Sequence, residues 1–209
     1  QSVEHAPVVN KKRKTFWLKQ LHQWHWITSA LCLISLLLFS ITGITLNHAS
    51  AISADPVIRE QEKTLPAPLL EQLNHRQEGA LPVAVRDWLD REMQIRTGDK
   101  AAEWSAGEVY LALPRPGGDA WLAIELADGT VLAEQTDRGW IAFFNDLHKG
   151  RHTGVAWSWF IDIFAVASLL FALTGLGLMV LHAKRRPATW PVTLAGLLLP
   201  WLLIVVFMH

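Results

Sequence analysis

The sequence predicts a membrane protein with three transmembrane α-helices and a small α+β domain inserted between the first two. Three apolar segments carry this prediction: Ile27–Leu46, Trp157–Leu181 and Pro191–Met208. The first has 20 residues without a charge, about 30 Å of helix, which matches the thickness of a bilayer's hydrocarbon core. The mean hydropathy is only +0.20, because a polar block at residues 49–150 separates the first two segments.

Each apolar segment has its own signature. The first is longer than the apolar core of a signal peptide, so we expect a retained span despite the small residues at 49–51. The second carries one acid, Asp162, near its start. The third is the shortest and contains Pro200, so it is expected to span with a kink.

Basic residues predict the orientation of the spans. They cluster at Lys11–Lys14 and Lys19 before the first span and at Lys184–Arg186 after the second. By the positive-inside rule both clusters are cytoplasmic, which puts the polar block and the C-terminus in the periplasm of a Gram-negative cell. The formal net charge of zero gives no indication of nucleic-acid binding. The predicted organisation is a cytoplasmic N-terminus at 1–16, transmembrane helices at 17–48, 151–182 and 191–209, a periplasmic domain at 49–150 and a cytoplasmic loop at 183–190.

The polar block predicts a helix, a three-stranded meander and a second helix. Asp128-Gly129 is a hairpin signal between two alternating segments. Acidic side chains are scattered among bases, and there is no Ser-His-Asp arrangement, metalloprotease His-Glu pair or glycine-rich nucleotide loop, so catalytic residues stay unassigned. The expected elements are a loop at 55–68, a helix at 83–96, strands at 108–113, 120–126 and 130–134, and a helix at 140–147.

Six histidines lie at the ends of the first two spans, three at each expected membrane face. Ionisable residues at such positions indicate function. Two imidazoles from neighbouring helices are the axial ligands that a six-coordinate haem iron needs, whereas zinc takes four ligands and Cys32 lies at the wrong depth. The candidate ligands are His22, His25 and His182 at the inner face and His48, His148 and His152 at the outer face.

Each histidine taken singly has an ordinary alternative, as an interfacial side chain, a helix C-terminal residue or a loop residue. His22 and His25 lie about 39 and 34 Å from His48 along a straight helix, so the two faces require separate sites. Helix rotation favours His22 and depth favours His25, and the choice between them stays open. Arg151 is a candidate partner for a haem propionate at the outer face.

Short motifs flank the spans and link the chain to a known family. They are Leu21-His22-Gln23-Trp24, Ser40-Ile41-Thr42-Gly43, Leu46-Asn47-His48, Leu147-His148-Lys149-Gly150-Arg151 and Leu173-Thr174-Gly175. In these motifs the chain resembles the PepSY-associated transmembrane helix family, and the polar block resembles a PepSY-type domain. Larger relatives in that family include inner-membrane haem proteins that reduce ferric siderophores on the periplasmic side.

The resemblance implies haem b, iron uptake and electron transfer to a ferric siderophore or other ferric chelate. The histidine pattern predicts one or two haems, with iron held through His48, His148, His182 and either His22 or His25. Because the chain has no flavin or nicotinamide motif, the expected electron donor is a quinol or a cytoplasmic reductase. Those relatives have more spans than this chain, so a homodimer could supply further helices.

Two functions of different classes follow. The first is a transmembrane electron carrier that reduces periplasmic ferric iron. The second is a non-enzymatic, membrane-anchored PepSY-like module that binds or regulates a partner. A simple anchor has no reason to place histidines at both faces of two helices, so the histidine pattern favours the electron carrier.

Overall fold

The computed structural model describes residues 9–52, 55–76 and 78–208, with only the backbone described at 9–12 and 185. Half of the predicted cytoplasmic N-terminus and the C-terminal His209 therefore lie outside the described residues. The chain divides into two compact units, which are described separately. The first contains the chain up to Leu37 together with the chain from Phe160 onward, and the second is Leu38–Trp159.

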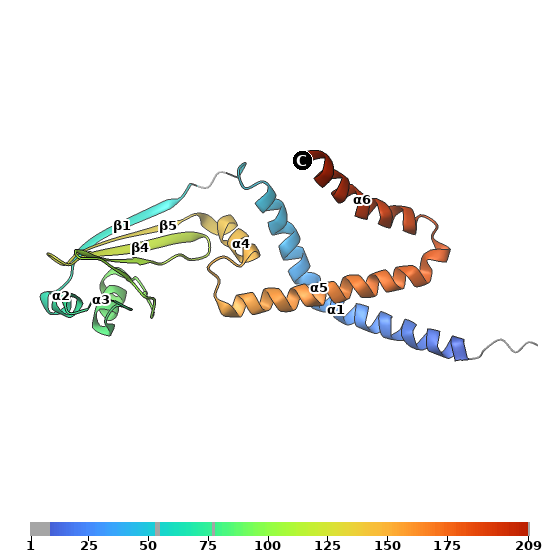
Figure 1. The fold of residues 1–209 in the computed structure, drawn as a ribbon, viewed down its shortest axis with the longest axis horizontal. Helices are drawn as coiled ribbons and strands as arrows, with labels where there is room; N and C mark the ends of the chain where they lie inside the picture. The colour runs from blue at the N-terminus through green and yellow to red at the C-terminus, as the bar shows by residue number, and fades with distance from the viewer. Residues whose placement is uncertain (1–8, 53–54, 77, 209) are drawn as a thin grey trace, which may run out of the picture. The chain divides into compact units, whose positions relative to one another are not determined.

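Three helices in the described part of the chain are long and apolar enough to cross a membrane (Figure 1). They are α1 (Val9–Asn47), α5 (Val155–His182) and α6 (Thr189–Phe207). Large apolar side chains such as Ile34, Ile163 and Leu197 remain exposed on them, as expected for helices whose solvent is lipid. All three predicted spans are therefore confirmed as helices, and α6 is one helix that contains Pro200.

The helix α1 begins well before the predicted apolar segment. Residues 11–20 are mostly lysine, arginine, glutamine and leucine, all of which favour helix. They extend the span at its basic end, so that His22 and His25 lie within a continuous helix rather than at its start.

The domain between α1 and α5 is a five-stranded antiparallel sheet in the order β1-β5-β4-β3-β2 (Figure 1). Helices α2 and α3 lie together on one side of it. The strands are β1 (Val57–Thr64), β2 (Glu103–Trp104), β3 (Glu108–Ala112), β4 (Gly118–Glu125) and β5 (Thr130–Asp137), and the helices are α2 (Ala67–Asn74), α3 (Val83–Met93) and α4 (Gly139–Lys149).

One face of the sheet forms the core with α3. Alternate residues of the central strands point inward, because successive side chains in a strand take opposite faces. Burial of these side chains is the main stabilising contribution to the domain. The buried set includes Val109 and Leu111 of β3, Leu122 and Ile124 of β4, Val131 of β5, and Val85, Leu89 and Met93 of α3.

The predicted loop at 55–68 is wrong, because it contains β1 and the start of α2. Beyond Val57 and Ile58 this segment is polar or charged and shows no apolar alternation. It is an edge strand that pairs with β5 along its whole length, from Val57 opposite Asp137 to Thr64 opposite Thr130. Edge strands are commonly polar, since charges there discourage pairing with other chains.

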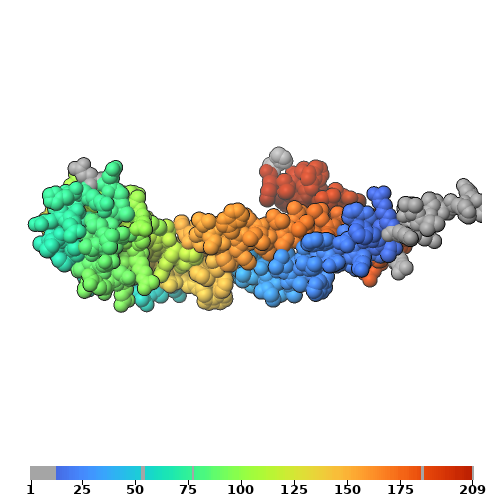
Figure 2. Space-filling view, turned by 90° about the horizontal axis from the view of Figure 1, so that it is seen from below, coloured from blue at the N-terminus to red at the C-terminus, as the bar shows by residue number. Residues whose placement is uncertain are grey.

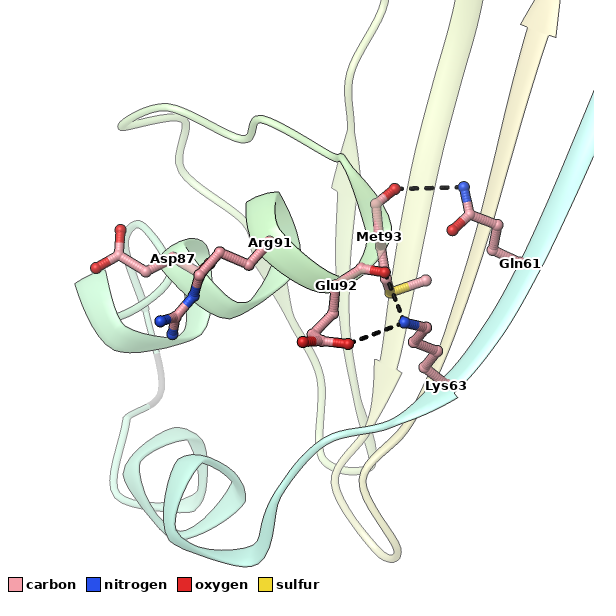
Figure 3. A network of polar contacts seen from close by, with 6 residues as sticks. All are labelled: Gln61, Lys63, Asp87, Arg91, Glu92 and Met93. Carbon is pink, nitrogen blue, oxygen red and sulfur yellow. Dashed lines mark hydrogen bonds and ion pairs between the residues drawn. The ribbon is translucent and has the colours of Figure 1, made fainter.

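Polar contacts join β1 to the end of α3 (Figure 3). The ammonium of Lys63 donates to the Glu92 carbonyl at 2.6 Å and to its carboxylate at 3.1 Å, and the amide of Gln61 donates to the Met93 carbonyl at 3.3 Å. The last carbonyls of a helix have no partner within it, and a cation near that end is favourable. These bonds explain how so polar a segment is held as a strand.

The predicted hairpin at Asp128-Gly129 is confirmed, since β4 and β5 pair as antiparallel neighbours and Gly129 has a positive φ. Its loop is longer than two residues, because β4 ends at Glu125. The carboxylate of Asp128 accepts the Thr130 N–H at 2.8 Å. This bond holds the pKa of Asp128 below its ordinary value.

The helix α4, predicted at 140–147, returns the chain toward α5 and is attached to the start of β4. The carboxylate of buried Asp146 accepts the backbone N–H of Gly117 at 2.9 Å. The helix ends at Gly150, which adopts the left-handed conformation typical of a helix C-terminus.

Candidate functional site

One pair of the six candidate histidines meets ring to ring in the described part of the chain: His22 on α1 and His182 on α5. Their ring centres are 6.1 Å apart and their planes are nearly perpendicular, at 88°. The Nδ1 of His22 lies 2.9 Å from the Leu18 carbonyl, and that of His182 lies 2.8 Å from the Leu178 carbonyl. A carbonyl oxygen can only accept, so each Nδ1 carries the proton and each neutral ring keeps its lone pair on Nε2.

The separation of the two rings fits a shared metal ion. A ligating imidazole nitrogen lies about 2 Å from the metal and about 1 Å from the centre of its own ring, so two axial imidazoles place their ring centres roughly 6 Å apart. The described residues contain no group of three or more His, Cys, Asp or Glu side chains able to hold an ion. The His22–His182 pair offers two imidazoles from separate helices, and two axial ligands are the number that a six-coordinate haem iron takes from a protein.

A hollow of about 750 Å³ lies beside His182, between α5 and the start of α6. Its volume falls within the range of small-molecule and cofactor sites, roughly 300–1,000 Å³. Leu178, Met179 and Val192 give it apolar walls, and the imidazole of His182 and the guanidinium of Arg186 supply polar groups. A flat apolar macrocycle with carboxylate side groups matches this lining, because guanidinium pairs with carboxylate.

His25 occupies a different setting, three residues after His22. Its Nδ1 lies 3.1 Å from the Thr174 hydroxyl and 3.3 Å from the Phe171 carbonyl, and its ring stacks on the Phe171 ring at 4.7 Å. A Cβ placed on Gly175 would lie 3.1 Å from the His25 ring. The helices α1 and α5 are therefore in direct contact at His25, which leaves no space for a macrocycle between them at this level.

At the other end of α1, His148 of α4 contacts the helix in a similar way. Its Nδ1 lies 2.6 Å from the hydroxyl of Thr42, a residue only 5 % exposed. Its ring centre is 4.9 Å from that of Phe39, and a Cβ on Gly43 would lie 3.7 Å from it.

The remaining outer-face candidates are exposed. His48 follows the last residue of α1 and its Nδ1 bonds the Ile44 carbonyl at 3.0 Å. His152 lies in the loop after α4 with φ at 57°, and Arg151 precedes it. The structure thus brings two inner-face candidates together, whereas a pairing among the outer-face candidates stays a prediction.

Four contributing residues were not singled out from the sequence as partners of histidine: Phe39, Thr42, Phe171 and Thr174. The signal that could have found them is the pattern Phe-x-x-Thr-Gly, which occurs at Phe39–Gly43 and again at Phe171–Gly175. Each copy receives one histidine.

Comparison with known families decides the identity of the chain. A model of the family described as "Putative PepSY_TM-like" matches residues 16–209, which include both histidine clusters and the sheet domain. The chain belongs to the PepSY_TM-like family. The resemblance drawn from the motifs is therefore confirmed, and the family and the three apolar helices identify the PepSY_TM-like chain as a membrane protein. No curated protein and no solved structure matches it.

Proposed function

We propose that this PepSY_TM-like protein is a b-type haem protein of the inner membrane that passes electrons to ferric iron in the periplasm. The observation that carries the proposal is the pair His22–His182, two imidazoles on separate helices at the spacing of axial ligands. When bound between them, haem supplies one-electron chemistry, and the chain supplies binding, orientation and electrostatics.

The contribution of each residue at the inner site follows from its contacts. The backbone carbonyls of Leu18 and Leu178 hold the two rings with Nε2 unprotonated, as a metal ligand requires. The apolar side chains beside His182 would contact the macrocycle, and an apolar surrounding affects the reduction potential of a bound haem. The guanidinium of Arg186 would neutralise a propionate.

A second, outer haem is the remaining part of the proposal. His48 and His148 are its proposed ligands, with His152 as the alternative and Arg151 as a propionate partner. Electrons would enter from a quinol or a cytoplasmic reductase and leave to a ferric siderophore or another ferric chelate. A homodimer could complete either site with helices from a second copy.

The inner site is tested by replacing its two histidines. His22→Ala and His182→Ala should each abolish the inner haem, because one imidazole cannot provide both axial bonds. Haem content per chain is measured on protein purified in detergent. His75→Ala is the control, because His75 is exposed at the end of α2 in the sheet domain, and it should keep the wild-type content. Full haem content in both His22→Ala and His182→Ala would overturn the assignment and leave the membrane-anchored binding module.

The orientation of the chain is a separate part of the proposal, supported by the basic residues around Lys14 and Lys184. Ala106 lies exposed in the sheet domain and Lys184 lies exposed after α5. With Cys32 replaced by serine, a membrane-impermeant maleimide added to intact spheroplasts should label Ala106→Cys and leave Lys184→Cys unlabelled until the membrane is opened. The reverse pattern would place the sheet domain in the cytoplasm.

A further inference from the structure

Two helices carry the same five-residue pattern, Phe-x-x-Thr-Gly, and each copy holds a histidine from another helix. We propose that these copies, Phe39–Gly43 of α1 and Phe171–Gly175 of α5, are histidine seats that lock helices together. We further propose that the α5 seat makes Thr174 a positioning residue, which acts through His25 to hold His22 opposite His182. This second step rests on the proposed haem function, whereas the seats themselves do not.

The hydroxyl of Thr174 is oriented by a hydrogen bond to a backbone carbonyl of its own helix. It donates to the Leu170 carbonyl at 2.7 Å, so its oxygen is left to accept the Nδ1–H of His25 at 3.1 Å. The Phe171 carbonyl, 3.3 Å from the same Nδ1, can only accept as well. Both partners therefore require the proton of neutral His25 on Nδ1.

The α1 seat repeats this arrangement. The hydroxyl of Thr42 donates to the Leu38 carbonyl at 2.8 Å and lies 2.6 Å from the Nδ1 of His148. In both seats the phenylalanine three residues before the threonine contacts the histidine ring. In the α1 seat this residue is Phe39, and Gly43, which follows the threonine, leaves room for the ring of His148. Three positions with matching contacts in two helices, Phe, Thr and Gly, indicate a repeated structural element.

Glycine is required most strictly in the α5 seat. Real Cβ contacts are rarely as short as the 3.1 Å that a side chain at Gly175 would make with the His25 ring. Two residues further along α5, a Cβ on Gly177 would lie 3.2 Å from Leu21. Small residues let membrane helices approach closely, and here the approach brings His25 within hydrogen-bonding distance of α5.

The contact between His25 and Thr174 has a direct consequence for the pair His22–His182. His22 and His25 are three residues apart, so they project from α1 about 60° apart and within one turn. Fixing His25 against Thr174 fixes the rotation and height of α1 relative to α5 beside His22. An interhelical hydrogen bond contributes little to the stability of a membrane protein, so its loss should alter the geometry more than the folding.

The first test reads the angle between the axial imidazoles in the haem-loaded protein. Low-spin ferric haem with perpendicular axial planes gives a strongly anisotropic EPR signal with a large principal g value, whereas nearly parallel planes give a rhombic signal. The two rings lie at 88° to each other, and a haem-loaded protein that keeps this angle should give the first kind of signal. Thr174→Val removes the acceptor but keeps the shape and should convert this signal toward the rhombic form, while Thr174→Ser should retain it.

Thr28→Val is the matched control. Its hydroxyl also donates to a carbonyl four residues earlier, that of Trp24 at 2.8 Å, and it also lies in a membrane helix next to His25. It should leave the EPR signal unchanged. A Thr174→Val protein with the wild-type signal would overturn the positioning role.

The second test needs no haem and separates the seats from the proposed function. ¹⁵N-histidine NMR of the haem-free full chain in lipid should show His25 and His148 protonated at Nδ1, with resonances assigned by their loss in His25→Gln and His148→Gln. Thr174→Val should shift only the His25 resonances, and Thr42→Val only those of His148. Finding either ring protonated at Nε2 alone in the wild type would overturn its seat, whether or not the protein binds haem.

Discussion

The histidine side chains show how a single atom decides what a residue can do. In His22, His48 and His182 the Nδ1 bonds a carbonyl of the same helix, and in His25 it bonds groups on another helix. A histidine whose Nδ1 is held by its own helix keeps its Nε2 for another partner, and the rings of His22 and His182 lie 6.1 Å apart. A histidine whose Nδ1 is held by a neighbouring helix also joins the two helices.

Gly117 offers a prediction at the same scale, in the sheet domain. Its φ is +71°, and a Cβ there would lie 2.8 Å from the backbone of Phe143 in α4. Gly117→Ala therefore combines left-handed strain with a clash against backbone, and should destabilise the domain by about 2–4 kcal/mol. Thermal unfolding of the full chain in detergent measures this loss.

Gly98 is the matched control for that substitution. Its φ is also positive, at +60°, but a Cβ there would meet no atom within 4 Å. Gly98→Ala should therefore lower the free energy of unfolding by about 1 kcal/mol, through the left-handed strain alone. Equal unfolding temperatures for the two variants would mean that the contact between Gly117 and α4 contributes nothing.

Among the elements, those with a strong apolar period were predictable and the polar ones were not. The three spans, α3, α4 and the strands β3, β4 and β5 follow from runs or alternations of apolar residues. The strands β1 and β2 and the helix α2 were missed, so the predicted three-stranded meander is a sheet of five strands. In β1 the ladder to β5 and the bonds from Lys63 and Gln61 to α3 replace apolar burial, and such partners are distant in sequence.

The sheet also gathers several acids on one face. The strand register places Glu60 and Glu62 of β1 on the same face as Glu134 of β5 and Glu103 of β2, opposite the core. Glu60 and Glu134 are direct cross-strand partners, a pairing that is unfavourable for like charges. The sequence does not show this negatively charged face, because its glutamates come from separate strands.

The candidate site was predictable in its composition but not in its pairing. Residue type and position relative to the spans select the six histidines. Helix rotation alone favoured His22 without deciding between it and His25. The choice of partner depends on how α1 packs against α5, which is set by contacts such as Leu21 with Gly177 and His25 with Thr174. Those contacts join residues more than 140 positions apart, beyond the reach of local patterns.

At the scale of the whole molecule, the chain joins membrane helices of the PepSY_TM-like family to a five-stranded sheet domain. Figure 2 shows the helices α1, α5 and α6 in space-filling form, and many large apolar side chains on these helices are exposed. In the proposed function the electrons come from a second molecule, a quinol or a cytoplasmic reductase. The helices then serve as the support on which a haem could be held at a defined distance from each membrane face.

The central claim is that the chain binds haem between His22 and His182. The most direct measurement is a reduced-minus-oxidised absorbance spectrum of the detergent-purified full chain, with a pyridine haemochrome count per chain. The account predicts a sharp low-spin b-type spectrum with at least one haem per chain, and two if the outer histidines also ligate. A chain that binds no haem after expression with ample haem supply would contradict the account and leave a membrane-anchored binding module.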